Sequence, residues 1–141
     1  MIKKIDHIGI IVKDIESSLE KYRNILGLDV KETEEVKVEG AMNRVDFLPV
    51  GSINIELIHT NAISGIAAAF LRERGEGIHH VAFEVSDLEK TFSELREKGI
   101  KFLWDKIIKG SRGSVVAFLE PEEMNGVYIE LVQKKIAEIS R

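Results

Sequence analysis

Residues 5–12 read IDHIGIIV, and residues 78–85 read IHHVAFEV. A second pair of similar stretches follows each of them, with INIELI at 53–58 and VYIELV at 127–132. Stretches that recur in the same order at nearly the same spacing indicate a duplicated folding unit rather than a chance motif. Each copy carries a histidine in its first stretch and a glutamate in its second. Two imidazoles and two carboxylates brought together by such a duplication predict a metal site.

Each copy has the pattern of a βαβββ unit. In the first copy Asp14 and Gly27 have the residue types that start and end a helix, and the apolar residues between them follow helical spacing. The predicted strands of this copy are residues 5–12, 28–38, 43–50 and 53–59. The second copy repeats the order with a helix at 87–99 and strands at 78–85, 101–108, 114–119 and 127–133.

These patterns predict an α+β fold made of two tandem βαβββ modules around a metal site. The modules cover about residues 3–59 and 77–133, a linking helix covers about 63–75, and the whole chain of residues 1–141 forms a single domain. The polar residues 134–141 are expected to add one helical turn at most.

Strand alternation places the candidate ligands on one side of the sheet, because successive side chains point to opposite faces. Ile8 and Ile10 oppose His7, and Ile55 and Leu57 oppose Glu56; the second copy repeats this arrangement. If the helices cover the apolar faces, four ligand-type side chains share the concave face: His7, Glu56, His80 and Glu130. By the same argument we expect the Asp46 carboxylate to enter this concavity, where its counterpart in the second copy is Ala117.

The remaining polar residues of note have ordinary structural interpretations. His79 follows the apolar alternation at the start of a strand and is expected to be a partly buried structural histidine. His59 ends a strand and is expected at the surface. The KGSRGS stretch at 109–114 offers amides and cations to a phosphate, but its spacing favours a hairpin turn.

Composition limits the function classes. The chain of 141 residues is 44% hydrophobic and 31% charged, with a net charge of −4, so it has no basic surface for nucleic acid. No apolar stretch approaches the roughly 20 residues that span a bilayer, which predicts no membrane segment and a cytoplasmic location. Because the chain has no cysteine, imidazole and carboxylate are the available ligands, and these suit one divalent ion such as Co, Ni or Zn.

The stretches IDHIGIIV, SLEKYRNILGL, RGEGIHHVAFEV and GVYIELV resemble those of the vicinal oxygen chelate superfamily, which includes glyoxalases, bleomycin-resistance proteins and dioxygenases. RGEGIHHVAFEV is most similar to the methylmalonyl-CoA epimerase branch. The resemblance implies a glyoxalase-like open barrel, a homodimer, and metal ligands at His7, Glu56, His80 and Glu130. It also implies an acyl-thioester substrate and proton-transfer bases at Glu130 and Asp46.

The resemblance therefore predicts an epimerase that inverts the α-carbon of a methylmalonyl-CoA-like thioester through a metal-stabilised enolate. The alternatives are a glyoxalase I-like lyase, a non-enzymatic binding protein of the bleomycin-resistance type and, more distantly, an extradiol dioxygenase. The chain also departs from the epimerase pattern, with GSRG at 110–113 and EPE at 120–122. These departures concern the rim of the pocket and leave the metal positions unchanged.

Overall fold

The computed structural model describes residues 1–135, which form strands, helices and two short 3-10 turns. The elements are, in order, β1 (Ile2–Ile11), α1 (Ile15–Leu26), β2 (Glu32–Val38), β3 (Ala41–Val50), β4 (Ile53–Thr60), α2 (Ile66–Arg74), β5 (Gly77–Val85), α3 (Leu88–Glu97), β6 (Ile108–Lys109), η1 (Ser111–Gly113), β7 (Val115–Phe118), η2 (Pro121–Met124) and β8 (Tyr128–Gln133). No helix within this part of the chain combines the length and apolar character that crossing a bilayer requires.

The two outer helices begin in the same way in the two halves. The Asp14 side chain accepts a hydrogen bond from the Ser17 backbone N–H at the start of α1, and Asp87 does the same for Lys90 at the start of α3. Such caps satisfy backbone donors that have no partner inside the helix. α1 ends at Gly27, whose φ of 70° lies in the left-handed region that glycine favours. The predicted ends of the first helix are confirmed.

All eight strands belong to one sheet with the order β2-β3-β4-β1-β5-β8-β7-β6. In each half the first strand lies parallel to the last, since β1 pairs with β4 and β5 pairs with β8. The antiparallel pairing of β1 with β5 joins the halves at the centre of the sheet. The duplication seen in the sequence is therefore a duplication of strand topology.

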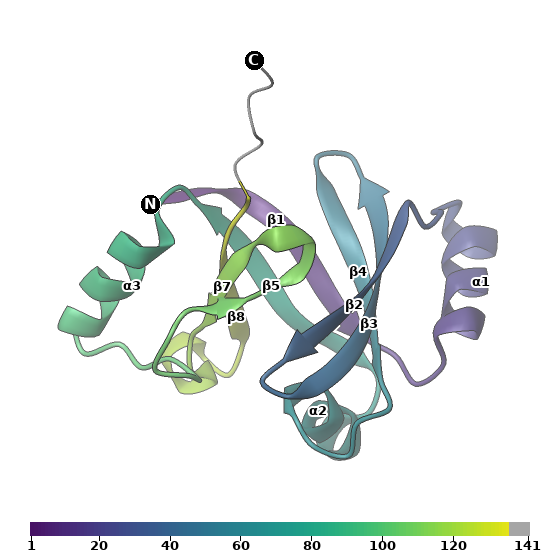
Figure 1. Ribbon diagram of the computed structural model, residues 1–141. Coiled ribbons are helices and arrows are strands. Elements are labelled where there is room, and N and C mark those ends of the chain that lie inside the picture. The colour runs from purple at the N-terminus through teal and green to yellow at the C-terminus, as the bar shows by residue number, and fades with distance from the viewer. Residues whose placement is uncertain (136–141) are drawn as a thin grey trace.

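The sheet curves into a nearly closed barrel, with α1 and α3 at its two opposite ends and α2 below its centre in the view of Figure 1. Contacts from η1 to the first half help to close it. The Arg112 guanidinium lies 4.1 Å from the centre of the Phe47 ring, and the Arg112 backbone N–H donates to the Glu34 carboxylate at 2.9 Å. The predicted α+β, glyoxalase-like barrel is confirmed.

The two outer helices cover the apolar faces that strand alternation assigned to them. Val12 and Leu57 pack with Ile15 of α1, and Leu131 packs with Leu88 of α3. The opposite, inner face also has an apolar part, which the sequence reasoning did not foresee. The inner-face residues Ile11, Val36, Val45, Phe47 and Ile58 cluster with Ala67 and Phe70 of α2.

The second half differs from the prediction in its second strand. Residues 101–108 were expected to form a strand, but β6 contains only Ile108 and Lys109. Phe102 makes only an isolated bridge to Leu119, and its ring packs against Phe92 of α3 at a centroid distance of 4.4 Å. This segment is held by side-chain packing rather than by a continuous ladder. The expected helical turn at 134–141 falls mostly outside the described residues.

Candidate metal centre

Three buried donor atoms converge where the two halves meet. Pairing of β1 with β5 brings His7 Nε2 within 3.1 Å of His80 Nε2. Glu130 on β8 places its Oε2 atom 3.1 Å from His80 Nε2 and 3.5 Å from His7 Nε2. All three side chains are almost fully buried. We call His7, His80 and Glu130 the triad.

The triad has the donors and spacing of a divalent metal site. An ion with bonds of about 2 Å at tetrahedral angles holds its ligands about 3.3 Å apart, close to the separations found here. Two histidines and one carboxylate also leave coordination positions for water or substrate, as catalytic sites do. The residues present therefore fit a single divalent ion.

The triad is strongly coupled electrostatically. Burial would raise the pKa of the Glu130 carboxyl, but His7 and His80 outweigh this effect and hold that pKa well below its usual value. Burial would lower the pKa of the His7 imidazole, but Glu130 and Asp6 raise it well above its usual value. A buried site that favours an ionised carboxylate is one that a metal cation can occupy.

Asp6 orients the first histidine of the triad. The β1–β5 register is irregular between Ile5 and His7, so Asp6 and His7 do not simply alternate across the strand. Asp6 Oδ2 lies 2.7 Å from His7 Nδ1, and Lys134 Nζ lies 2.9 Å from Asp6 Oδ1. Burial alone would raise the pKa of Asp6, but His7 and Lys134 lower it to about 2. With Nδ1 held by a carboxylate, Nε2 is the nitrogen left for a metal.

His79 occupies the corresponding position beside the second histidine. A second register shift pairs Gly9 with His80 but Ile10 with Ile78, which leaves His79 out of the ladder. His79 Nδ1 lies 2.9 Å from His80 Nδ1, and its ring stacks on Tyr128 at 4.5 Å. Burial and the neighbouring His80 lower the pKa of His79 to about 3. His79 is more fully buried than predicted, and it contacts His80 although strand alternation assigns the two residues to opposite faces.

Position 9 must be glycine because the His80 ring lies directly against it. A Cβ atom at Gly9 would lie 2.2 Å from Cε1 and 2.6 Å from Nδ1 and Nε2 of His80. These distances are far below van der Waals contact, so any side chain would displace the ring. The space beside Gly9 is therefore filled by the His80 ring.

Glu56 lies beside the triad but not within it. Its Oε2 atom is 2.9 Å from His7 Nδ1, the ring nitrogen that also contacts Asp6. Asp6, His7 and Glu56 form a second group whose ligand atoms lie within 4.8 Å of one another. Of the four predicted ligands, the structure brings His7, His80 and Glu130 together at one point and places Glu56 against the opposite nitrogen of His7.

A cavity adjoins the triad and Glu56. The part of its wall that comes from β2, β3, β4 and α2 is apolar apart from Asn43 and Glu56, and includes Val36, Val45 and Ile58. The other wall is formed by β5 to β8, and Lys109, Gly110 and Ser111 line its margin. Because Lys109 is exposed, the cavity reaches the surface beside the η1 turn.

Comparison with known proteins agrees with this arrangement. A sequence profile described as the glyoxalase/bleomycin resistance protein/dioxygenase superfamily matches residues 6–118, most of the chain. The chain belongs to this superfamily. The profile spans His7, Glu56 and His80 and ends before Glu130.

Several relatives within the superfamily align over almost their whole length. An ethylmalonyl-CoA/methylmalonyl-CoA epimerase of Cereibacter sphaeroides is 34% identical over 135 residues, covering 94% of this chain and 99% of the relative. The uncharacterized protein YqjC of Bacillus subtilis is also 34% identical, over 94% of this chain and 93% of its own length. The structure of a Streptomyces coelicolor methylmalonyl-CoA epimerase variant with 2-nitronate-propionyl-CoA superposes with a TM-score of 0.89 at 32% identity, covering 99% and 100% of the two chains.

One predicted site residue of this superfamily member lies elsewhere. Asp46 is fully buried on the outer face of β3, where it pairs in register with Leu57 rather than with Glu56. It accepts hydrogen bonds from Thr33 Oγ1 and Arg44 Nε, and Arg44 also contacts Glu16 of α1. The expectation that Asp46 enters the concavity is therefore wrong. Both faces of β3 carry large apolar side chains, so alternation alone did not identify the inner face.

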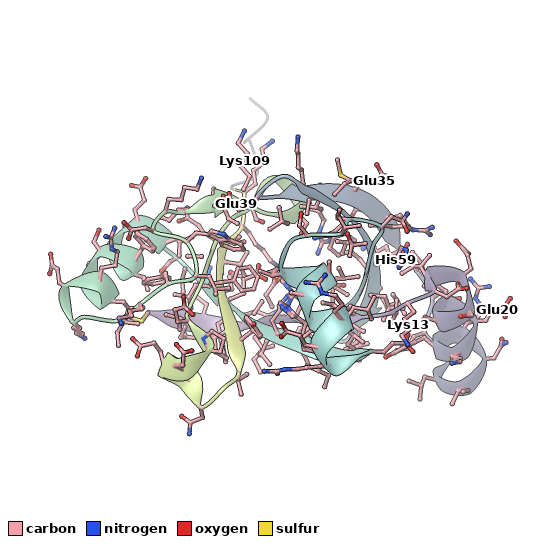
Figure 2. All side chains as sticks on the ribbon, turned by 90° about the horizontal axis from the view of Figure 1, so that it is seen from below. Lys13, Glu20, Glu35, Glu39, His59 and Lys109 are labelled. Carbon is pink, nitrogen blue, oxygen red and sulfur yellow. The ribbon has the colours of Figure 1, made fainter. Side chains whose placement is uncertain are left out.

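Two further predictions for this superfamily member concern its surface. His59 is partly exposed, lies near α1 in Figure 2, and contacts the Val12 carbonyl oxygen at 3.2 Å. The KGSRGS stretch begins with Lys109, the last residue of β6, and continues into the η1 turn, where the Ser114 N–H donates to the Ser111 carbonyl at 3.0 Å. This agrees with a local turn. Lys109 is exposed and lies at the outer edge of the molecule in Figure 2.

Proposed function

We propose that this protein is a divalent-metal-dependent epimerase that inverts the α-carbon of a methylmalonyl-CoA-like thioester. The observation that supports this most strongly is the buried triad beside a cavity in a chain that aligns end to end with epimerases of that substrate class. The superposed relative with a CoA ligand supports an acyl-CoA substrate.

The proposed ligands are His7, His80 and Glu130. Glu56, the fourth ligand predicted from the sequence, would have to leave its contact with His7 Nδ1 to reach the same ion. When bound there, Co, Ni or Zn would act as a Lewis acid toward the substrate oxygens beside the acidic C–H bond. Asp6 holds His7 Nδ1, so the orientation of that ring is set before any ligand arrives. Burial of the cluster strengthens electrostatic interactions at the reacting centre.

Glu130 is the proposed base that removes the α-proton. Its carboxylate lines the cavity, and a carboxylate within reach of an acidic C–H can accept the proton and later return it. Inversion needs a proton delivered to the opposite face of the substrate. Because Asp46 lies outside the cavity, we assign this delivery to a water molecule that enters past Lys109 and Ser111. The hydroxide that this leaves is neutralised by the proton that Glu130 gives up, which restores the carboxylate.

Incubation of the metal-loaded protein with one epimer of methylmalonyl-CoA in deuterated water tests this function. We expect the second epimer to form and to carry one deuterium at the α-carbon. Glu130→Gln should lower the rate by about 100-fold or more, the usual size of a lost general base. Glu20→Gln, at an exposed position on α1, is the matched control and should leave the rate unchanged. Absence of both deuterium and the second epimer would contradict the proposal.

The other functions considered from the sequence predict different results. A glyoxalase I-like enzyme would convert a glutathione hemithioacetal to lactoylglutathione and leave the CoA ester unchanged. A binding protein of the bleomycin-resistance type would bind its ligand equally well with and without a divalent ion. Assay of the metal-loaded and chelator-treated protein on both substrates therefore separates the three functions.

We further propose that the protein is a homodimer located in the cytoplasm. The dimer is an expectation from the superfamily resemblance, and the location follows from the sequence pattern. Light scattering of the purified protein measures its oligomeric state, and fractionation of cells that express the untagged protein measures its location. A monomer or a membrane-associated fraction would contradict the corresponding statement.

A further inference from the structure

Asn43 is a buried polar residue that the proposed mechanism does not use. It lies on β3, where it pairs in register with Val36 of β2 and Thr60 of β4. The same face of β3 carries Val45 and Phe47, which belong to the inner cluster. Asn43 is only 7% exposed, and it lines the cavity shared by the triad.

The Asn43 amide has an unmet hydrogen-bonding requirement. Within residues 1–135 no group donates a hydrogen bond to its Oδ1 atom, although that atom is fully buried. A buried polar atom left without a partner costs about 1–3 kcal/mol, so such groups usually have a partner. Rotation of the amide about the Cβ–Cγ bond exchanges Oδ1 with Nδ2, so the position that now holds the unpartnered acceptor can present an N–H donor to a ligand in the cavity.

The surroundings of Asn43 indicate what kind of group it would bind. On the β2–β4 and α2 side the cavity is apolar apart from Glu56 and Asn43, and the neighbouring Val36, Val45 and Ile58 suit an alkyl branch. Glu56 is the one carboxylate in this wall and lies against His7 Nδ1, whereas Asp46 faces α1. Asn43 is neutral and offers N–H donors, which favours an acyl group that carries an additional oxygen.

We infer that Asn43 is a specificity-determining residue whose amide donates a hydrogen bond to the free carboxylate of the substrate acyl group, while the adjacent apolar wall takes the alkyl branch. This inference rests on the proposed acyl-CoA function. It assigns to one residue the preference for a malonyl-type acyl group over an acyl group that carries only alkyl substituents. Asn43 does not transfer a proton, because an amide does not ionise in this pH range.

Calorimetric titration of the metal-loaded protein with two probes tests the inference. The probes are 2-nitronate-propionyl-CoA, whose anionic nitronate oxygens stand in for the carboxylate, and propionyl-CoA, which has no such group. Asn43→Leu should weaken binding of the first about 10- to 100-fold, the range for a lost hydrogen bond to a charged group. Binding of propionyl-CoA should change less than about 2-fold. Asn61→Leu, the same substitution at an exposed position, is the control.

Thermal unfolding separates this role from a structural one. Because Asn43 Oδ1 has no partner within the described chain, Asn43→Leu should leave the melting temperature unchanged or raise it. A lowered melting temperature with equal losses for both probes would overturn the inference in favour of a structural role. Equal binding of the nitronate by the wild type and Asn43→Leu would also overturn it. Failure of the wild type to bind either probe would instead refute the proposed function, and the inference with it.

Discussion

Asp6 and His79 show how much of the site depends on residues that do not touch the metal position. Each precedes a triad histidine in the chain and contacts its Nδ1 atom, at 2.7 Å for Asp6 and 2.9 Å for His79. The sequence contained a signal for this, because each histidine of the repeat follows a polar residue. Strict strand alternation places adjacent residues on opposite faces, so it predicts no contact between Asp6 and His7 and none between His79 and His80. The role of Asp6 was therefore not predicted.

Asp6→Asn should weaken metal binding about 10- to 100-fold, because the amide no longer stabilises the oriented His7 ring as a carboxylate does. Competition with a chromophoric chelator measures this affinity. Glu84→Gln is the control, since Glu84 shares Lys134 with Asp6, at 3.5 Å, but does not contact the triad. An unchanged affinity for Asp6→Asn would show that Asp6 does not position the ligand.

At the scale of the strands, the register of pairing determines which face of the sheet a side chain occupies, and residue type alone did not show this. The histidine and glutamate positions were predictable because they recur, and because one face of each strand is clearly apolar. β3 lacks such a contrast: Val45 and Phe47 alternate with Asp46 and Leu48, and both sets are buried. Only the pairing with β4 shows that Asp46 faces α1 and that Asn43 faces the cavity.

Asp46→Ala tests the corrected placement of this strand. The substitution removes the buried one of the two carboxylate partners of Arg44 and leaves Thr33 Oγ1 without its acceptor, so we expect the free energy of unfolding to fall by roughly 2–4 kcal/mol. Denaturant titration measures this change. Metal affinity should stay as in the wild type. Asp29→Ala, which breaks an exposed ion pair with Arg23, should cost less than about 1 kcal/mol. Loss of metal by Asp46→Ala with normal stability would restore the original placement.

In the second half of the chain, side-chain packing replaces most of a predicted strand. Residues 101–108 have the composition of a strand, and their counterparts in the first half form β2. In the structure Phe102 packs against Phe92 and Trp104 packs against Phe118, so aromatic contacts replace most of the expected ladder. Tertiary packing of this kind overrides local propensity and cannot be deduced from one strand in isolation.

At the scale of the molecule, the repeat was sufficient to predict the architecture. One unit cannot bury its own apolar face and ligands, so two must combine, and the β1–β5 pairing is where they do. His7 comes from the first half, while His80 and Glu130 come from the second. A metal bound by this triad therefore links the two halves of the barrel.

Metal binding should stabilise the whole chain as one unit. At a free metal concentration 100 times the dissociation constant, the folded state gains about 2.7 kcal/mol over the metal-free protein. Thermal unfolding should therefore show one transition that moves to higher temperature when metal is added and returns when a chelator removes it. Two separate transitions, or a shift confined to one of them, would show that the triad does not join the halves.

The metal content of the purified protein tests the central claim most directly. Elemental analysis after metal loading and desalting should find one divalent ion per chain in the wild type and in His59→Ala, whose histidine lies outside the triad. His80→Ala removes one triad donor and should lose the ion. A wild-type protein that retains no divalent ion, or a His80→Ala variant that retains it in full, would contradict the account.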